Sequence, residues 1–247
     1  MKRVVVVGAT DGLGKALAAE YASRGSWVCL VGRGAEKLET VRAEIAGRFP
    51  DATIAAVVCD LREANRIAPA FQDAIAVIGH CDLFVYNAGV MFPGDGLTAE
   101  TAKDRETMEV NAVAAVEMLG LAANYFREAR RGQIAAISSI AGDRGRKGNP
   151  AYNASKAALT TYLEGLRNRL YPFGVTVSTV KPGFLGTKLT AGKSGLFWVA
   201  PPGEAARIIA DRLERRREVF YVYRRWGIFG LALHHVPRVL FKRFGPP

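Results

Sequence analysis

Three side chains in the middle of the chain have the types and spacing of an acid–base site. Tyr152 and Lys156 are four positions apart, so in a helix they lie on one face, about one turn apart. A cation so placed favours the tyrosinate form and lowers the pKa of the phenol from about 10 toward neutral pH. Ser139 precedes Tyr152 by thirteen positions and brings a hydroxyl to the end of an apolar run. The three together predict proton transfer to or from a substrate oxygen.

A glycine-rich turn near the N-terminus predicts a phosphate site. Gly8, Gly12 and Gly14 follow the apolar run at positions 4–7 with the spacing GxxxGxG. Glycines there let the backbone approach a pyrophosphate, which then lies on the amide groups and the positive end of the next helix. The residues of this turn expected to contact a dinucleotide are Gly8, Thr10, Asp11, Gly12, Leu13 and Gly14.

The next two apolar runs end in residues that bear on which dinucleotide binds. Where an acid would select a free ribose hydroxyl, the second run ends in Gly32 and Arg33, and an arginine suits a 2′-phosphate. NADP is therefore favoured over NAD; the alternative, a solvated Arg33 in a surface loop, leaves the missing acid unexplained. Asp60, followed by Leu61, ends the third run, where it either accepts a hydrogen bond from the adenine or caps the helix that follows.

The elements that must position these residues follow from alternating apolar runs and helical patterns, which is typical of an α/β fold. The runs are mostly apolar throughout, as in a parallel sheet covered on both faces. Pro69 is expected to begin its helix, because proline inside a helix removes a hydrogen bond. Strands are expected near 3–8, 27–32, 54–59, 82–86, 133–138, 175–181 and, more weakly, 219–223. Helices are expected near 12–24, 35–48, 69–78, 101–129, 152–171 and 203–216.

At this point the chain resembles the short-chain dehydrogenase/reductase family over residues 1 to about 222. The resemblance rests on motifs in the family's order and spacing: the glycine turn, Asn87-Ala88-Gly89, Asn111, Ser139, Tyr152, Lys156 and Pro182-Gly183. It implies a single Rossmann-type domain, doubly wound, with about seven parallel strands in the order 3-2-1-4-5-6-7. The chain departs from the pattern at Val7, where the family usually has threonine, and at Tyr86, where it usually has asparagine.

The resemblance also implies roles for individual residues. Tyr152 would be the proton donor or acceptor, Lys156 would also bind the nicotinamide ribose, and Ser139 would polarise the carbonyl. Asn111 would hold a water in a proton relay. Asn87, Ala88 and Gly89 would contact the cofactor, and Pro182, Gly183 and Thr187 would flank the nicotinamide. We therefore expect an NAD(P)-dependent oxidoreductase acting on CH–OH groups, working as a carbonyl reductase with NADP.

Two basic segments bear on the substrate. The loop between Ser139 and Tyr152 carries Arg144, Arg146 and Lys147, which either bind a phosphate on the substrate or are simply solvated. The tail, residues 223–247, has cations and large apolar side chains but no Asp or Glu. Such a composition over residues 224–244 suits an anionic membrane surface, and a cap on the substrate pocket or a subunit interface is the alternative.

Loop and tail together resemble the subgroup of the family that contains polyprenyl-phosphoryl keto-sugar reductases. That resemblance implies a phosphorylated or lipid-linked keto-sugar as substrate, with its phosphate near Arg144, Arg146 and Lys147 and its lipid near residues 226–244. The family resemblance further implies a homodimer or homotetramer formed through the helices near 101–129 and 152–171.

Composition limits the remaining classes. The 247 residues carry a net charge of +11, with 49% hydrophobic residues and three cysteines that lack the spacing of a metal site. The N-terminal apolar run is too short for a signal peptide, and we expect a cytoplasmic protein, peripheral on the inner face of the membrane if the tail binds there. The cations fall in loops and tail rather than on one base-reading helix, so no nucleic-acid partner is expected. A non-catalytic protein that senses NADP is the alternative function.

Overall fold

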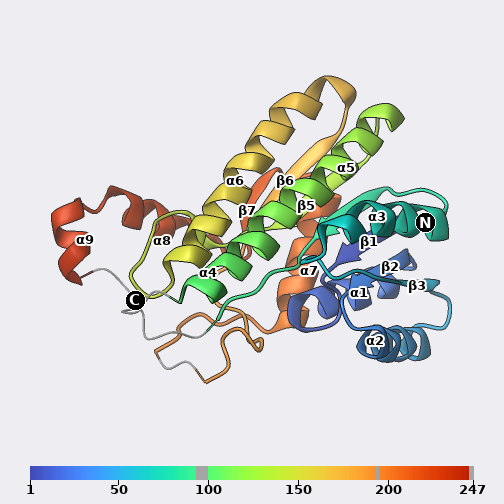
Figure 1. Ribbon diagram of the computed structural model, residues 1–247, viewed down its shortest axis with the longest axis horizontal. Helices are drawn as coiled ribbons and strands as arrows, with labels where there is room; N and C mark the ends of the chain where they lie inside the picture. The colour runs from blue at the N-terminus through green and yellow to red at the C-terminus, as the bar shows by residue number, and fades with distance from the viewer. Residues whose placement is uncertain (93–99, 193–194, 245–247) are drawn as a thin grey trace.

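A seven-stranded parallel sheet forms the centre of the protein (Figure 1). The computed structural model describes residues 1–92, 100–192 and 195–244, so the end of the expected tail lies outside it. The order β3-β2-β1-β4-β5-β6-β7 is the expected one, and every neighbouring pair is parallel. The strands are β1 (Arg3–Val7), β2 (Trp27–Gly32), β3 (Ile54–Val58), β4 (Leu83–Tyr86), β5 (Gln133–Ile137), β6 (Thr176–Lys181) and β7 (Val219–Tyr221).

Helices cover both faces of this sheet, which is why most of its strands are largely apolar on both sides, although β6, with the sequence TVSTVK, also carries polar residues. Alternate residues of β1 show the two cores: Val4 and Val6 pack in one, and Val5 and Val7 in the other. One core is closed by α1 (Gly12–Ser23), α2 (Ala35–Arg48) and α7 (Pro202–Glu214). The other is closed by α3 (Ala64–Ile78), α5 (Ala114–Ala129) and α6 (Pro150–Leu170). The expected α/β class is confirmed.

The expected start of the third helix at Pro69 is wrong. Helix α3 begins at Ala64 and contains Pro69 in its second turn. Proline there removes one backbone hydrogen bond. The helix keeps an apolar face in which Ile67, before the proline, and Phe71, after it, are both buried. Packing of that face against the sheet outweighs the one missing bond.

The long helix expected near 101–129 is interrupted at its centre. It consists of α4 (Thr101–Met108), a π-helical turn η1 (Glu109–Val113) and α5, and the turn contains Asn111. π-Helical turns inside α-helices occur frequently at functional sites. Tyr86, one of the two departures from the family pattern, donates a hydrogen bond from its buried hydroxyl to the Val110 carbonyl in this turn at 2.8 Å. The unusual residue at the end of β4 therefore supports the backbone beside Asn111.

The tail forms two helices, α8 (Arg224–His235) and α9 (Arg238–Phe244), at one end of the molecule (Figure 1). The loop after the 3₁₀ turn η2 (Ile140–Gly142) fastens them. Arg144 donates to the carbonyl oxygens of Leu233 and, at 2.8 Å, Val236, and its guanidinium lies 3.8 Å from the centre of the Phe241 ring. These contacts bind the C-terminal end of α8 and the start of α9 to the loop that precedes α6.

Asp143 forms a second connection between this loop and the last strands. Its carboxylate accepts hydrogen bonds from Lys181 Nζ at 2.6 Å and from the Tyr221 hydroxyl at 2.8 Å. The Asp143 and Lys181 side chains are each only 12% exposed, so this ion pair is largely shielded from solvent. Within the described ranges, no helix is both long enough and apolar enough to cross a membrane.

Candidate active site

A cleft of about 360 Å³ opens at the carboxyl ends of the central strands. It runs from the glycine turn after β1 to the end of β5, where Ser139, Tyr152 and Lys156 line it. Its volume is that of an ordinary ligand site. The carboxyl edge of an open parallel sheet is where ligands bind in such folds.

The glycine turn has the close backbone packing that a phosphate cradle needs. Gly8 has φ +81°, and a Cβ added to it would lie 2.6 Å from the Ala88 Cα. A Cβ on Gly14 would lie 2.0 Å from the Gly8 carbonyl oxygen and 2.6 Å from Nδ2 of Asn87. Asn87 in turn donates to that oxygen at 3.0 Å. These positions admit only glycine, and they bring the N-terminus of α1 to the cleft, so the residues present fit a dinucleotide.

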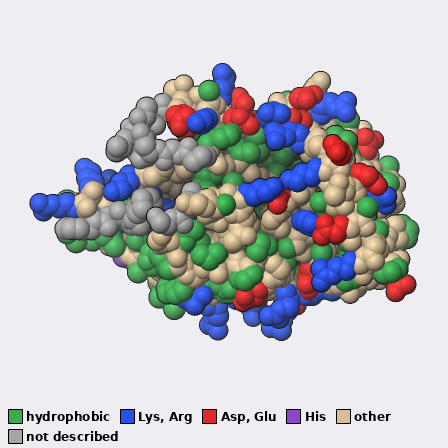
Figure 2. All heavy atoms as spheres, turned by 90° about the horizontal axis from the view of Figure 1, so that it is seen from below, with side chains coloured by type: hydrophobic (Ala, Val, Ile, Leu, Met, Phe, Trp, Pro, Cys, Tyr) green, Lys and Arg blue, Asp and Glu red, His purple; other side chains and the backbone are tan. Residues whose placement is uncertain are grey.

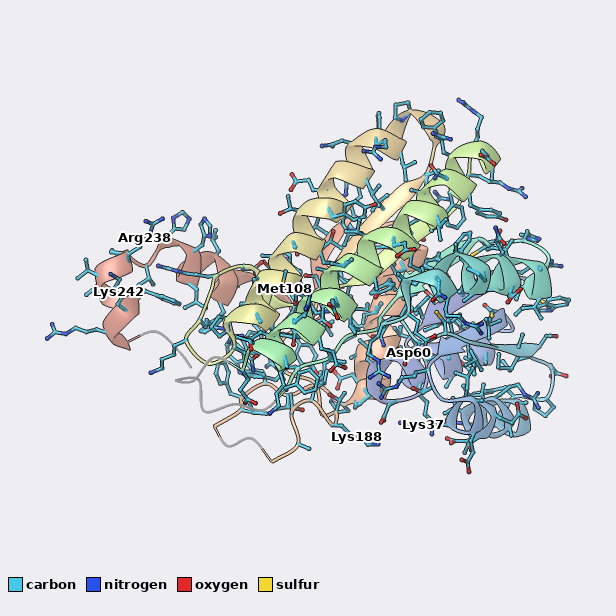
Figure 3. The ribbon with its side chains drawn as sticks, viewed as in Figure 1. Lys37, Asp60, Met108, Lys188, Arg238 and Lys242 are labelled. Carbon is cyan, nitrogen blue, oxygen red and sulfur yellow. The ribbon has the colours of Figure 1, made fainter. Side chains whose placement is uncertain are left out.

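Asp11 caps helix α1 at the cleft mouth. It also forms ion pairs with two lysines that the sequence did not predict as part of the site. Its carboxylate accepts from the Gly12 N–H at 2.8 Å, and it pairs with Lys188 at 2.8 Å and Lys37 at 3.1 Å. The hydrogen bond from Lys188, together with those from Lys37 and Gly12, lowers the pKa of Asp11 to about 2, although burial opposes the shift. Figure 3 shows Lys37 and Lys188 pointing to the same region, below Asp60.

Arg33 lies exposed on the same rim and lines the cleft. A Cβ on neighbouring Gly32 would lie 2.7 Å from Thr10 Cγ2, so a carboxylate-bearing residue does not fit there without a shift. Asp60 lines the cleft as expected, but its carboxylate is paired with Arg62 at 2.5 Å, which lowers the pKa of Asp60. The mouth is therefore rich in cations.

The three residues of the expected acid–base site do come together. Ser139 follows β5, and its Oγ accepts a hydrogen bond from the Ala141 N–H at 3.1 Å. Tyr152 and Lys156 lie in the first two turns of α6, with Lys156 Nζ 5.8 Å from the centre of the tyrosine ring. Lys156 is buried and donates to the Ile137 carbonyl oxygen at 2.9 Å. Its burial lowers the pKa of Lys156 to about 8.

The expected lowering of the tyrosine pKa by Lys156 is wrong for this structure. Burial raises the pKa of Tyr152 above its ordinary value, opposed by a hydrogen bond from Ser139 and by the charge of Arg146. The lysine ammonium is held at the Ile137 carbonyl, and desolvation acts on both groups. Tyr152 is therefore protonated at neutral pH, the state that a proton donor requires.

Asn111 lies fully buried beside Lys156, in the π-helical turn. Its Oδ1 accepts from the Val90 N–H at 2.7 Å, and its Nδ2 donates to the Val90 carbonyl at 2.9 Å and to Ser155 Oγ at 3.1 Å. A Cβ added to Gly89 would lie 3.2 Å from Asn111 Oδ1 and 3.4 Å from Lys156 Nζ. The side chain of Asn111 thus holds the strand-to-loop turn after β4 against α6.

Several of the expected cofactor residues line the cleft, and two pack behind it. Those lining it are Gly8, Thr10, Asp11, Gly12, Leu13, Arg33, Asp60, Leu61, Asn87, Ala88, Gly89, Tyr152, Lys156, Pro182 and Thr187. Gly14 packs against the Gly8 carbonyl oxygen behind the turn. Gly183 lies under the Trp226 ring, where a Cβ would be 2.0 Å from the indole.

The sequence did not predict the aromatic wall beside Gly183, which is formed by the rings of Phe184, Phe197, Trp226 and Phe229. Trp226 is 2% exposed, although the sequence placed it at the start of the lipid-facing segment. Phe184, Phe197 and Phe229 each lie with ring centres 5.2–5.5 Å from that of Trp226. The only sequence signal was the apolar character of the tail, which does not distinguish an inward from an outward ring.

The three cations of the loop have different environments. Arg144 donates from Nη1 to the Leu233 and Val236 carbonyl oxygens at the C-terminal end of α8, so that nitrogen is occupied within the protein. Lys147 is exposed, and Arg146 is half-buried near Tyr152. Among the described residues, no group of three or more His, Cys, Asp or Glu side chains is placed to hold a metal ion.

Comparison with known proteins identifies the family. The model for short chain dehydrogenases matches residues 2–195. The chain belongs to the short-chain dehydrogenase family. An uncharacterized oxidoreductase of Myxococcus xanthus is 35% identical over 190 residues, 77% of this chain and 74% of the relative. The mouse dehydrogenase/reductase SDR family member 7B is 32% identical over 189 residues, 76% of this chain and 58% of the relative.

Solved structures share the fold of this short-chain dehydrogenase. A short-chain dehydrogenase from Sphingobium yanoikuyae in complex with NADPH has a TM-score of 0.83 at 23% identity, with 96% of this chain and 97% of that chain covered. An alcohol dehydrogenase from Thermococcus sibiricus complexed with 5-hydroxy-NADP has a TM-score of 0.81 at 21% identity, with 90% and 95% covered. The protein is thus an oxidoreductase of the short-chain dehydrogenase family.

Proposed function

We propose that this enzyme reduces a carbonyl group with NADPH, or oxidises the corresponding alcohol, and that Tyr152 exchanges the proton with the substrate oxygen. The supporting observation is that Ser139, Tyr152 and Lys156 meet at the end of the cleft opposite the glycine turn. Bound dihydronicotinamide supplies the hydride. The half-buried, protonated Tyr152 donates to the carbonyl oxygen, and the Ser139 hydroxyl stabilises the charge that develops there.

Lys156 and Asn111 act around this step. We expect the buried ammonium of Lys156 to bind a ribose hydroxyl and to favour the tyrosinate left after proton transfer. Asn111 fixes the turn after β4 and lies next to the lysine, where a water in a proton relay would be held. The proton lost by Tyr152 would be replaced along this route.

The test is Tyr152→Phe, measured as NADPH oxidation across a panel of ketones with NADPH binding followed by fluorescence. We expect kcat to fall at least about 100-fold, the lower range of a general-acid contribution, with binding retained. Normal turnover in the variant would refute the role of Tyr152. Tight NADPH binding by the wild type without turnover on any ketone would instead support the non-catalytic sensor.

We propose that NADP is preferred over NAD. Support comes from Arg33 on the cleft rim and from Gly32, where a side chain would collide with Thr10. Arg33 has no carboxylate within ion-pair distance among the described residues, whereas the nearby Lys37 and Arg62 are paired. Arg33→Ala should weaken NADPH binding at least about tenfold and leave NADH binding unchanged, with equal losses for both cofactors refuting the preference.

We propose that the outer faces of α8 and α9 bind an anionic membrane from the cytoplasmic side. Support comes from Ile228, Leu231 and Val239, which are 73%, 62% and 76% exposed, beside the cations of an acid-free tail. Figure 2 shows Lys and Arg side chains gathered with hydrophobic ones at the end of the molecule that α9 occupies, and Figure 3 shows Arg238 and Lys242 on that helix. A lipid-linked keto-sugar would suit an enzyme held at that surface.

Flotation with vesicles containing anionic lipid tests this surface in the full-length protein. We expect the wild type to float and the Ile228→Ser, Leu231→Ser double variant to remain at the bottom. Val77→Ser is the control, since Val77 is 50% exposed on α3 and lies outside the tail. Equal flotation of all three proteins, or of none, would refute the membrane role.

We also propose a homodimer or homotetramer formed through α5 and α6. Val113 and Val116 support this, because both are apolar and exposed where the π-helical turn meets α5. Val113→Glu should lower the mass measured by light scattering. An unchanged mass in that variant would exclude this face as the interface.

A further inference from the structure

Arg146 occupies a fixed place next to the proposed proton donor. Its main-chain carbonyl accepts a hydrogen bond from Asn153 Nδ2 at 3.1 Å, and Asn153 follows Tyr152 in α6. The Arg146 side chain lines a small cavity together with Ile140, the residue that follows Ser139, and its charge acts to lower the pKa of Tyr152. The loop therefore places this cation in a cavity that adjoins the segment after Ser139, beside the cleft rather than in its lining.

The side chain enters a small cavity between the loop and α8. The cavity has a volume of about 40 Å³, and the aromatic rings of Phe184, Phe197, Trp226 and Phe229 form much of its wall together with Arg146. That space accommodates a group of a few heavy atoms, since a single water needs at least about 10–15 Å³. The surroundings are apolar, and burial lowers the pKa of Arg146.

Arg146 forms no ion pair with any residue that the structure describes, whereas Lys181 close by is paired with Asp143. Among the described residues no carboxylate lies within 4 Å of its guanidinium, and the guanidinium donates no hydrogen bond to any of them. Asp143 also lines the cavity, but its two oxygens are taken by Lys181 and Tyr221. The buried Trp226 Nε1 likewise has no acceptor. The cavity thus presents the Arg146 guanidinium without an acceptor among the described residues, in an apolar setting where an unpaired charge is costly.

We propose that Arg146 binds an anionic group of the substrate, a carboxylate or a phosphate, carried close to the carbonyl that Tyr152 protonates. The guanidinium is planar and binds either group through two parallel hydrogen bonds. The aromatic wall would pack against the apolar part of the substrate next to that group. This proposal rests on the proposed function in that it places the anion relative to the carbonyl, and it assigns to Arg146 alone a role that the sequence divided among three cations.

The test measures binding without turnover. Calorimetry on the NADPH-loaded protein compares benzoate and phenyl phosphate with the neutral benzamide, in wild type, Arg146→Met, Arg146→Lys and Lys147→Met. We expect at least one anion to bind the wild type about tenfold or more tightly than benzamide does, the ratio that one charge-assisted hydrogen bond supports. Arg146→Met should lose that ratio and Arg146→Lys should keep part of it. Lys147→Met, which removes the same charge from an exposed position, should keep all of it.

The two anions distinguish a carboxylate site from a phosphate site. If no anion binds the wild type more tightly than benzamide, or if Arg146→Met and Lys147→Met behave alike, the proposal is wrong. Thermal unfolding separates binding from structure: Arg146→Met should keep or raise the melting temperature, and a fall would show that Arg146 merely holds the loop. Tyr152→Phe should keep the anion preference while losing turnover, so failure of the proposed catalytic role and failure of the anion site give different results.

Discussion

Replacing Lys156 by methionine is expected to make the ligand-free protein more stable at neutral pH. The ammonium is buried, and desolvation lowers the pKa of Lys156 from 10.5 to about 8. At about 1.4 kcal/mol per pH unit, keeping this group charged in the fold costs about 3 kcal/mol. Methionine has a similar length and no charge, but it leaves the Ile137 carbonyl without its donor, a loss of about 1–2 kcal/mol. The net gain is about 1–2 kcal/mol, or about 2–8 °C in melting temperature.

The stability difference between Lys156→Met and the wild type changes with pH. Because the pKa of Lys156 is lower in the folded state, the unfolded chain binds the proton more readily between the two values. The stability of the wild type therefore rises with pH from about 8 to about 10.5, and the full cost is present below about pH 8. The advantage of Lys156→Met should shrink by about 2–3 kcal/mol between about pH 7 and about pH 10.

Urea unfolding of both proteins at the two pH values measures this. Lys147→Met is the matched control, because it makes the same substitution at an exposed lysine and should give no pH-dependent difference. A Lys156→Met protein that is less stable than wild type at neutral pH, or a difference that does not change with pH, would refute the reasoning. The same variant should lose turnover, since the buried charge is retained for binding and catalysis.

Three further substitutions test the packing that positions the site. Gly14→Ala should weaken NADPH binding at least about tenfold, because its Cβ would lie 2.0 Å from the Gly8 carbonyl oxygen. Gly47→Ala is the control: it has open space around it in α2 and should stabilise the protein by about 0.5–1 kcal/mol. Trp226→Ala should lower the free energy of unfolding by about 3–5 kcal/mol, measured in urea, and Trp198→Ala, at a 40% exposed ring, should cost clearly less. Tyr86→Phe should cost about 1–3 kcal/mol by leaving the Val110 carbonyl unpaired, and a neutral result would show that the π-helical turn does not need this bond.

Local chemistry was enough to predict the strands, the glycine turn and the acid–base residues. Buried parallel strands are mostly apolar on both sides, so they appear in the sequence as apolar runs. Gly8 and Gly14 have no room for a Cβ, so the turn appears as a glycine motif. The start of α3 was missed because its position depends on the energy gained when Ile67 and Phe71 pack on the sheet. The residue types around Pro69 do not indicate how much energy that packing supplies.

By itself, the sequence determined the fold class and the place of Tyr152 relative to Lys156, because helix periodicity fixes the neighbours of residues four apart. Only the tertiary structure decided what each cation does. Arg144 and Arg146 are two positions apart in one basic loop. Arg144 donates to carbonyls at the C-terminal end of α8, whereas Arg146 faces an aromatic cavity and has no counter-ion in the described part of the chain. Their roles depend on where α8 packs, and that helix reaches the loop from about 90 residues away in the chain. The burial of Trp226 and the pKa of Tyr152 depend on the same long-range packing.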